Sequence, residues 1–294
     1  MKYLFILSIL TTFVFAKINV AVSIIPQKTF VEKIGGDKVN VVAIVKPGDS
    51  PHTYEPKPSD MIQISKTEVY FPIKIDFENV WLDKFANQNK NMKFSEMTDG
   101  INFLTMKKHT HHNHKDEHNH VGEKSHIIKI KPDPHTWISP LNVKIMAKNI
   151  YYTLSKIDPT NQSYYKKNYK NFLDEINTTD NKIRELLFKI ENNSKFMVFH
   201  PAWGYFARDY ALVQLKVEAE GKEPKPKELI KIIEKAKKEN IKAIFTQKEF
   251  STKSAQTIAD SLNIKVLKET PLAQNWSENL IKMANAIANS NLEN

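Results

Sequence analysis

Short β-branched runs alternate with segments of helical periodicity, and this alternation constrains the fold more than any other feature. Seven runs have the length and composition of buried strands: 19–25, 39–45, 69–73, 196–200, 212–217, 243–246 and 265–267. Between most of them, apolar residues recur every three or four positions, as they do in amphipathic helices. The pattern therefore predicts an α/β fold with mostly parallel sheets.

Helical spacing lasts longer in the middle of the chain than elsewhere. It covers residues 143–155 and 161–190, which are separated by Asp158 as a cap and Pro159 at a first helical position. Because α/β material lies on both sides, we expect a rigid helix that joins two lobes. The alternative is one continuous domain with a long surface helix, since a single domain can reach this length. Shorter helices are expected at 31–34, 58–66, 80–86, and from a cap at Ser251 to residue 262.

The first sixteen residues have the composition of a secretory signal peptide. Lys2 supplies a positive charge, an apolar stretch follows, and Ala16 ends it with a small residue. A membrane-spanning helix needs about 20 apolar residues, and Lys17 and Asn19 follow too soon; an uncleaved anchor is the alternative. The chain has no cysteine, so it offers neither a thiolate ligand nor a lipid attachment site after cleavage. We therefore expect a protein that is free in the periplasm.

These features divide the chain into four expected parts: a signal peptide at 1–16, an amino-terminal lobe at 17–155, a linking helix at 156–192 and a carboxy-terminal lobe at 193–294. The formal net charge is +10, but the lysines are spread over most of the chain and many adjoin acidic residues. A nucleic-acid-binding protein gathers such charge on one face, and the dinucleotide and P-loop motifs are absent. We expect a monomer that binds no nucleic acid.

Three histidines stand at the ends of predicted elements. His52 lies in a proline-rich loop directly after the strand at 39–45, and His200 closes the strand at 196–200. His135 follows Pro134 and precedes the helix that begins near residue 140. Ligands of open α/β sheets bind beyond the carboxyl ends of the strands, so at least two of these imidazoles point toward a site.

A site formed by these three imidazoles favours zinc. Neutral imidazoles are strong nitrogen donors for Zn²⁺, with Zn–N distances of about 2.0–2.1 Å. Mn²⁺, Ca²⁺ and Mg²⁺ prefer more oxygen ligands. The alternative is that each histidine is a buried residue with its own hydrogen bond, as histidines often are.

A second histidine cluster lies in a polar segment at 107–126 that also contains Asp116, Glu117 and Glu123. Its histidines are His109, His111, His112, His114, His118, His120 and His126. A segment of this composition cannot build a core, so we expect a mobile loop that binds metal with low affinity. An accidental polar insertion and an engineered tag are the alternatives.

Hydrolase motifs are absent. Residues 112–116 begin like the binuclear H-x-H-x-D-H motif, but Glu117 stands where the last histidine should be, and no H-E-x-x-H helix occurs. A zinc hydrolase with Glu55 or Glu269 as general base is the alternative from another class of protein. We expect no enzyme activity.

Three segments resemble the metal-binding segments of the ZnuA-like zinc-binding proteins of ABC importers. They are PGDSPHTYEPKPSD around His52, DPHTWISP around His135 and FHPAWGYFARDYAL around His200. FPIKIDFENVWLDKF and PLAQNWSENL are similar to further landmarks of that family. The resemblance therefore covers nearly the whole chain after the signal peptide.

The resemblance implies two α/β lobes joined by one long rigid helix, with the metal site at the lobe interface. It assigns His52 and His135 to the amino-terminal lobe and His200 to the carboxy-terminal lobe. A histidine- and acid-rich loop before the second ligand is typical of the zinc members rather than the manganese members. The implied cargo is Zn²⁺, and the implied partner is a membrane permease with its ATPase.

The chain departs from the family pattern at the usual oxygen ligand. Members carry an aspartate in an Asp-Pro-Leu-like segment, whereas this chain reads Thr270-Pro271-Leu272, preceded by Glu269. Either Glu269 is the fourth ligand or water takes that position. Pro51 also stands where some zinc members carry an acid. A manganese or iron carrier of the same family is a further alternative.

Overall fold

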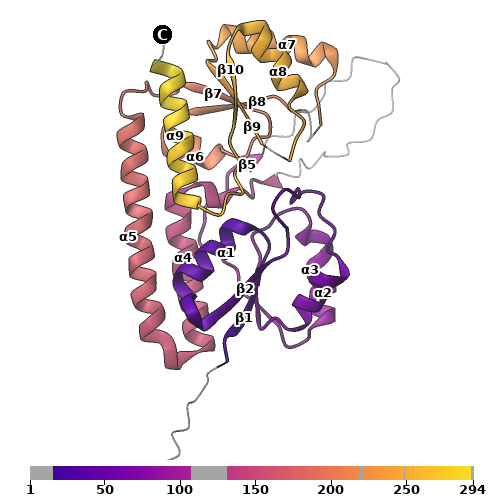
Figure 1. Ribbon diagram of the computed structural model, residues 1–294, viewed down its shortest axis with the longest axis vertical. Helices are drawn as coiled ribbons and strands as arrows, with labels where there is room; N and C mark the ends of the chain where they lie inside the picture. The colour runs from indigo at the N-terminus through magenta and orange to yellow at the C-terminus, as the bar shows by residue number, and fades with distance from the viewer. Residues whose placement is uncertain (1–15, 107–130, 219–221, 248, 293–294) are drawn as a thin grey trace, which may run out of the picture.

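Two α/β lobes stand one above the other beside a pair of long helices (Figure 1). The computed structural model describes residues 16–106, 131–218, 222–247 and 249–292. Each lobe contains a four-stranded sheet in which all paired strands are parallel. The predicted fold class, two lobes with mostly parallel sheets, is confirmed.

The sheet of the amino-terminal lobe has the strand order β2-β1-β3-β4. Its strands are β1 Ile18–Val22, β2 Val39–Ala43, β3 Val69–Phe71 and β4 Lys93–Phe94. Its helices are α1 Ile25–Gly35, the 3-10 turn η1 Gly36–Lys38, α2 Pro58–Ser65 and α3 Glu78–Gln88. Helix α1 covers one face of the sheet, and α2 and α3 cover the other (Figure 1). Both faces are therefore buried, as strands of continuous β-branched residues require.

The sheet of the carboxy-terminal lobe has the order β10-β9-β7-β8. Its strands are β7 Lys195–Val198, β8 Val213–Lys216, β9 Ala243–Thr246 and β10 Lys265–Lys268. Its helices are α6 Gly204–Asp209, α7 Pro226–Lys238, α8 Lys253–Leu262 and α9 Trp276–Leu292. All seven predicted strands are present in the two sheets, each within a few residues of its expected bounds.

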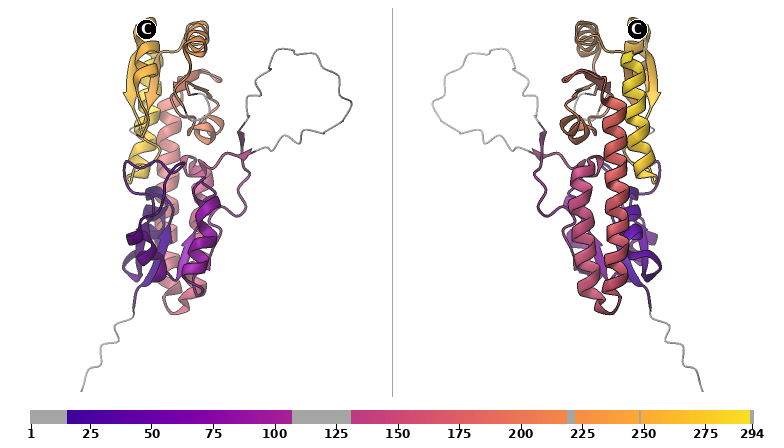
Figure 2. Two further views of the ribbon diagram at one scale, coloured as in Figure 1. Left: turned by 90° about the vertical axis from the view of Figure 1, so that its right-hand side faces the viewer. Right: turned by 90° about the vertical axis from the view of Figure 1, so that its left-hand side faces the viewer.

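Two long helices run side by side along the molecule: α4 Pro140–Ile157 and α5 Gln162–Leu187. The 3-10 turn η3 Pro159–Asn161 separates them, and the Asp158 carboxylate fixes this turn by accepting hydrogen bonds from the Asn161 amide and the Tyr165 hydroxyl. Helix α5 packs against α1 of one lobe and α9 of the other, so it spans both lobes (Figure 2). It lies inside the expected range of 156–192.

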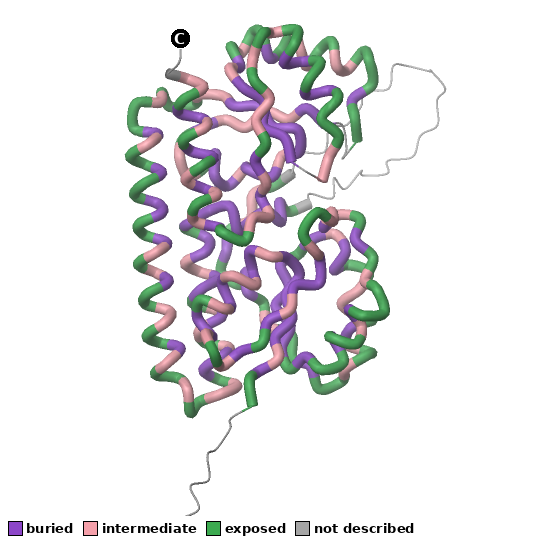
Figure 3. Tube along the Cα trace, viewed as in Figure 1, coloured by how far each residue is buried: buried purple, intermediate pink, exposed green. Residues whose placement is uncertain are grey.

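Aromatic side chains tie the two lobes together behind the sheets. The Phe30 ring on α1 lies 5.7 Å from that of Phe172 on α5 and 5.5 Å from that of Trp276 on α9. The Trp276 indole N–H also donates to the carbonyl of Trp137 at 2.7 Å, and the Trp137 indole N–H donates to that of Pro271 at 2.8 Å. Buried residues therefore continue from one lobe into the other (Figure 3).

Some short elements differ from the sequence expectation. Strands β4, β5 Thr105–Met106 and β6 Lys131–Pro132 have two residues each, too few to show a periodicity. The cap assigned to Ser251 is wrong by one residue: the N-cap of α8 is Thr252, and the Ser251 hydroxyl accepts a weak bond from the Lys253 N–H.

Two segments with sequence-based predictions lie outside the described residues. They are 1–15, which holds most of the signal-peptide pattern, and 107–130, which holds the second histidine cluster. Within the described ranges, no helix combines the length and the apolar character needed to cross a membrane.

Candidate metal centre

His52 lies on the loop between β2 and α2. The end of this loop is fixed by Asp60, whose carboxylate accepts a hydrogen bond from the Tyr54 hydroxyl at 2.8 Å and another from the Lys57 N–H at 2.9 Å. Asp60 sits in the first turn of α2, where a carboxylate also interacts favourably with the helix dipole. The sequence around His52 thus shapes a loop that holds the ring at the carboxyl end of the sheet.

His135 lies on the segment that leads into α4. The Asp133 carboxylate accepts hydrogen bonds from the His135 backbone N–H at 3.0 Å and from its ring Nδ1 at 2.7 Å. The Tyr205 hydroxyl on α6 donates to the Asp133 carbonyl at 2.8 Å. A residue of the carboxy-terminal lobe therefore holds the segment that carries His135.

His200 lies two residues after the end of β7, and both its backbone and its ring have partners in the carboxy-terminal lobe. Its backbone exchanges two hydrogen bonds with the side chain of Gln247, at 3.3 Å to the carbonyl oxygen and 3.0 Å from the amide nitrogen. Its ring stacks on Phe250, with centroids 4.8 Å apart and an interplanar angle of 19°. The bonds to Gln247 hold its backbone, and the stacking on Phe250 holds its ring.

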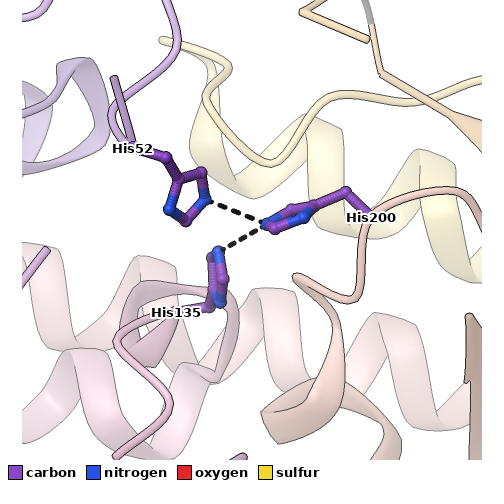
Figure 4. A group of neighbouring side chains, drawn as sticks. All are labelled: His52, His135 and His200. Carbon is purple, nitrogen blue, oxygen red and sulfur yellow. Dashed lines mark hydrogen bonds between the residues drawn. The ribbon is translucent and has the colours of Figure 1, made fainter. Parts of the chain in front are cut away.

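The three rings converge between the lobes (Figure 4). His200 Nε2 lies 3.0 Å from His52 Nε2 and 3.3 Å from His135 Nε2, and the ligating atoms of all three residues lie within 4.8 Å of one another. Two nitrogens that bind one tetrahedral zinc at about 2.0–2.1 Å are separated by about 3.3–3.4 Å. The two distances from His200 Nε2 are thus close to those expected around a shared metal ion.

Each ring has a carboxylate behind it. His52 Nδ1 lies 2.8 Å from Asp76, His135 Nδ1 2.7 Å from Asp133, and His200 Nδ1 2.9 Å from Glu218. An ionised carboxylate only accepts hydrogen bonds, so in each pair the proton belongs on Nδ1 and the lone pair of Nε2 faces the centre. Three lone pairs this close repel one another unless a cation or a proton lies between them.

Burial and charge keep the site ready for a cation. Burial lowers the pKa of His200 to about 4, although Glu218 acts in the opposite direction. Burial acts to raise the pKa of Asp133, but the neighbouring His135 outweighs it and leaves that pKa below its ordinary value. Neutral rings backed by ionised carboxylates are the protonation states that metal binding requires.

A cavity of about 20 Å³ adjoins the three rings. Ile75, Trp137, Phe250 and Leu272 form its apolar wall, and Gln247 and Glu249 also line it. A space of this size holds about one water molecule. The site therefore offers three nitrogen ligands and little room for more than one additional ligand.

Glu269 does not join the group. Its Oε1 lies 2.9 Å from Lys282 Nζ on α9, and its backbone N–H bonds the Thr246 carbonyl at the end of the sheet. Among the described residues, the candidate metal-binding cluster contains only His52, His135 and His200. The seven histidines of the second cluster lie outside the described residues.

The sequence analysis predicted no role at the site for Asp76 or Glu218, and it included Asp133 only as part of the DPHTWISP segment. Asp76 and Glu218 follow β3 and β8 closely, so the strand-end rule that found His52 and His200 could also have found them.

Comparison with known proteins identifies similar molecules. The family described as ZnuA, zinc-uptake complex component A, periplasmic, matches residues 20–290. A structure described as a crystal structure of ZnuA has 40% sequence identity and a TM-score of 0.82, and the match covers 93% of this chain and 98% of that one.

Two curated relatives differ in their described metal. The high-affinity zinc uptake system protein ZnuA of Bacillus subtilis is 30% identical over 251 residues, 85% of this chain and 76% of the relative. The manganese ABC transporter substrate-binding lipoprotein PsaA of Streptococcus pneumoniae serotype 4 is 27% identical over 247 residues, 80% of this chain and 74% of the relative.

Proposed function

We propose, because the chain belongs to the ZnuA family of periplasmic zinc-uptake components, that it captures Zn²⁺ and delivers it to the membrane permease and ATPase of an ABC importer. Members of this family are metal-binding, substrate-binding proteins of ABC transporters. The observation that carries the proposal is the convergence of three Nε2 atoms from the two lobes, each with a carboxylate behind its ring.

His52, His135 and His200 are the proposed zinc ligands, and a water molecule takes the fourth position. Three imidazoles and one water give the tetrahedral coordination that Zn²⁺ adopts with protein ligands. Asp76, Asp133 and Glu218 orient the rings and increase their basicity. The pairing of Glu269 with Lys282 is the reason that we assign water rather than Glu269 to the fourth position.

Zinc is the proposed metal because the site is rich in nitrogen and short of room. Mn²⁺ favours carboxylate and water oxygens, whereas the candidate cluster in the described chain has no carboxylate ligand. The adjoining cavity holds about one water, which is too few to complete an octahedral shell. A manganese or iron carrier is the second candidate, because relatives such as PsaA are described as manganese proteins.

We propose a binding role without catalysis. The two glutamates considered as general bases for a zinc hydrolase are poorly placed, since Glu55 is exposed and is not among the residues around the cavity, and Glu269 pairs with Lys282. Ester or peptide turnover that a chelator abolishes would argue for the hydrolase instead.

We also propose that the protein works free in the periplasm. The family description includes a periplasmic location, residues 1–16 have the composition of a signal peptide, and the chain has no cysteine for lipid attachment.

Deletion of residues 108–124 tests which histidines form the tight site. We expect the deletion variant to bind one zinc per molecule with the affinity of the full chain, because the three proposed ligands lie outside the deleted segment. The weaker binding events of the full chain should disappear, because the deletion removes six of the seven histidines of the second cluster. We expect those events to be weak because ordering a polar segment offsets much of its coordination energy. Calorimetric titration with zinc gives both stoichiometries, and loss of the tight event on deletion would reverse the assignment.

Acidification should weaken zinc binding because protons compete with the metal for the ring nitrogens. Titration against a competing chelator of known pH dependence should show lower affinity at pH 5 than at pH 7.5. Equal affinities would contradict histidine ligation. Because the pKa of His200 is about 4, its own share of the competition should appear only as the pH approaches that value.

The metal-free protein should also lose stability in acid. An unfolded chain protonates His200 near its ordinary pKa of 6.5, whereas the folded chain does so only near 4. The unfolded state therefore binds more protons between these values, and the free energy of unfolding should fall by up to about 3 kcal/mol as pH drops from 6.5 to 4. Urea unfolding of the chelator-treated protein measures this change, which should be reduced in His200→Gln.

A further inference from the structure

We propose that Glu78 is a positioning residue of the metal site: its buried carboxylate fixes the loop at 73–76 and, through Asp76, sets the orientation of His52. The inference rests on the proposed function. It extends that function by assigning a role to a residue that contacts neither the metal nor any of its proposed ligands.

The Glu78 carboxylate is buried in the first turn of α3, with the residue 3% exposed. It accepts hydrogen bonds from the backbone N–H groups of Ile73 at 3.0 Å and Lys74 at 2.7 Å, and one from the Ser23 hydroxyl. Burial raises its pKa to about 7, and these three donors offset part of that effect. A buried acid held by backbone donors of a single loop acts as an internal anchor for that loop.

The anchored loop has a conformation that needs support. It connects β3, which ends at Phe71, to α3, which begins at Glu78. Within it, Lys74 has φ of 66°, a left-handed conformation that is unfavourable by about 1–2 kcal/mol for a residue with a Cβ atom. The bond from the Lys74 N–H to Glu78 holds this conformation in place.

The same loop carries the carboxylate that orients His52. Asp76 lies two residues after Lys74, and its Oδ2 is 2.8 Å from His52 Nδ1. The His52 side chain is 25% exposed, compared with 4% for His135 and 8% for His200. Because His52 has the least surrounding packing, its orientation depends most on Asp76, and the position of Asp76 depends on the loop that Glu78 anchors.

A double-mutant cycle with zinc tests the inference. Glu78→Gln replaces one acceptor oxygen by an NH₂ group that faces N–H donors. It should lower zinc affinity by about 5- to 10-fold, less than the 10- to 100-fold typical for a direct partner of a ligand. In an Asp76→Asn background the same change should lower zinc affinity by less than about twofold, because the carboxylate through which Glu78 acts on His52 is already absent.

Glu228→Gln is the matched control. Glu228 also lies in the first turn of its helix, α7, and accepts a backbone N–H bond, from Lys225 at 2.9 Å, but its helix carries none of the site residues. It should leave zinc affinity unchanged. If Glu78→Gln does not fold, Glu78→Asp, which keeps the charge and withdraws the carboxylate by one methylene, enters the same cycle.

Two results would overturn the inference. One is wild-type zinc affinity in the Glu78 variant; the other is an equal loss in the wild-type and Asp76→Asn backgrounds, which would indicate a general effect on folding. Failure of the proposed function looks different, because a His200→Ala protein would then retain tight zinc binding whatever residue stands at position 78.

Discussion

Replacing His200 by alanine should weaken zinc binding by more than about a hundredfold. Even the loss of a residue that hydrogen-bonds to a metal ligand typically lowers metal affinity by about 10- to 100-fold, and His200 is itself a proposed ligand. His200 supplies the Nε2 atom that lies closest to those of both other rings, at 3.0 and 3.3 Å. Its loss leaves two nitrogen ligands on the amino-terminal side and none from the other lobe. Chelator competition with the 108–124 deletion variant measures the tight site without interference from the second histidine cluster.

The controls for this variant separate ligation from folding. Alanine leaves the Glu218 carboxylate buried without its partner, which destabilises a fold, whereas His200→Gln keeps a donor close to it. Both variants should lose zinc affinity, and the glutamine variant should keep the circular dichroism spectrum of the parent. His118→Ala, made in the full chain, should retain the tight site. Tight zinc binding by both His200 variants would exclude an interlobe histidine site.

Zinc should bind more tightly than manganese by at least about a thousandfold, because imidazole ligation follows the usual affinity order in which Mn²⁺ is weakest and Zn²⁺ among the strongest. The expectation depends on a ligand group of three histidines and on a cavity with room for about one water. Competition of Mn²⁺ against bound Zn²⁺, followed with a zinc-specific dye, gives the ratio. Comparable affinities would favour the manganese carrier.

Thr270→Asp provides the complementary variant. It places an aspartate where the sequence resemblance implies an Asp-Pro-Leu-like segment, in the loop that reaches the cavity through Leu272. An added carboxylate supplies the oxygen ligand that manganese prefers, so the ratio of zinc to manganese affinity should fall. Thr270→Asn has a similar shape without the charge and should leave the ratio closer to that of the parent.

The three central histidines could be predicted from the sequence because each lies in a segment that adjoins a predicted strand or helix. The end of a strand can be predicted without knowledge of the whole fold, and parallel strands place their carboxyl ends at one edge of the sheet. The lobes and the long helix could be predicted for a similar reason, since periodicity is a local property. The structure brings these histidines together, while their role as zinc ligands remains a prediction.

The strand-end rule could locate Asp76 and Glu218, but the sequence could not show which histidine each of them meets. Asp76 meets His52, and Glu218 meets His200, only because β1 lies between β2 and β3 and because β7 and β8 are neighbours. Strand order is a tertiary property that a local pattern does not contain. The fourth ligand is a similar case: Glu269 is one residue from the position at which the resemblance implies an aspartate, and its carboxylate pairs with Lys282 instead of joining the histidines.

The indole bonds between Trp137, Pro271 and Trp276 have a consequence for how the metal leaves. A clamshell motion, in which the two halves swing apart about a hinge, would break both bonds and split the aromatic cluster around Phe30. We therefore expect the exit route to open by a local swing of His52, the most exposed of the three proposed ligands, while the rest of the molecule stays closed. A permease could then release the metal by displacing only the loop between β2 and α2 that carries His52.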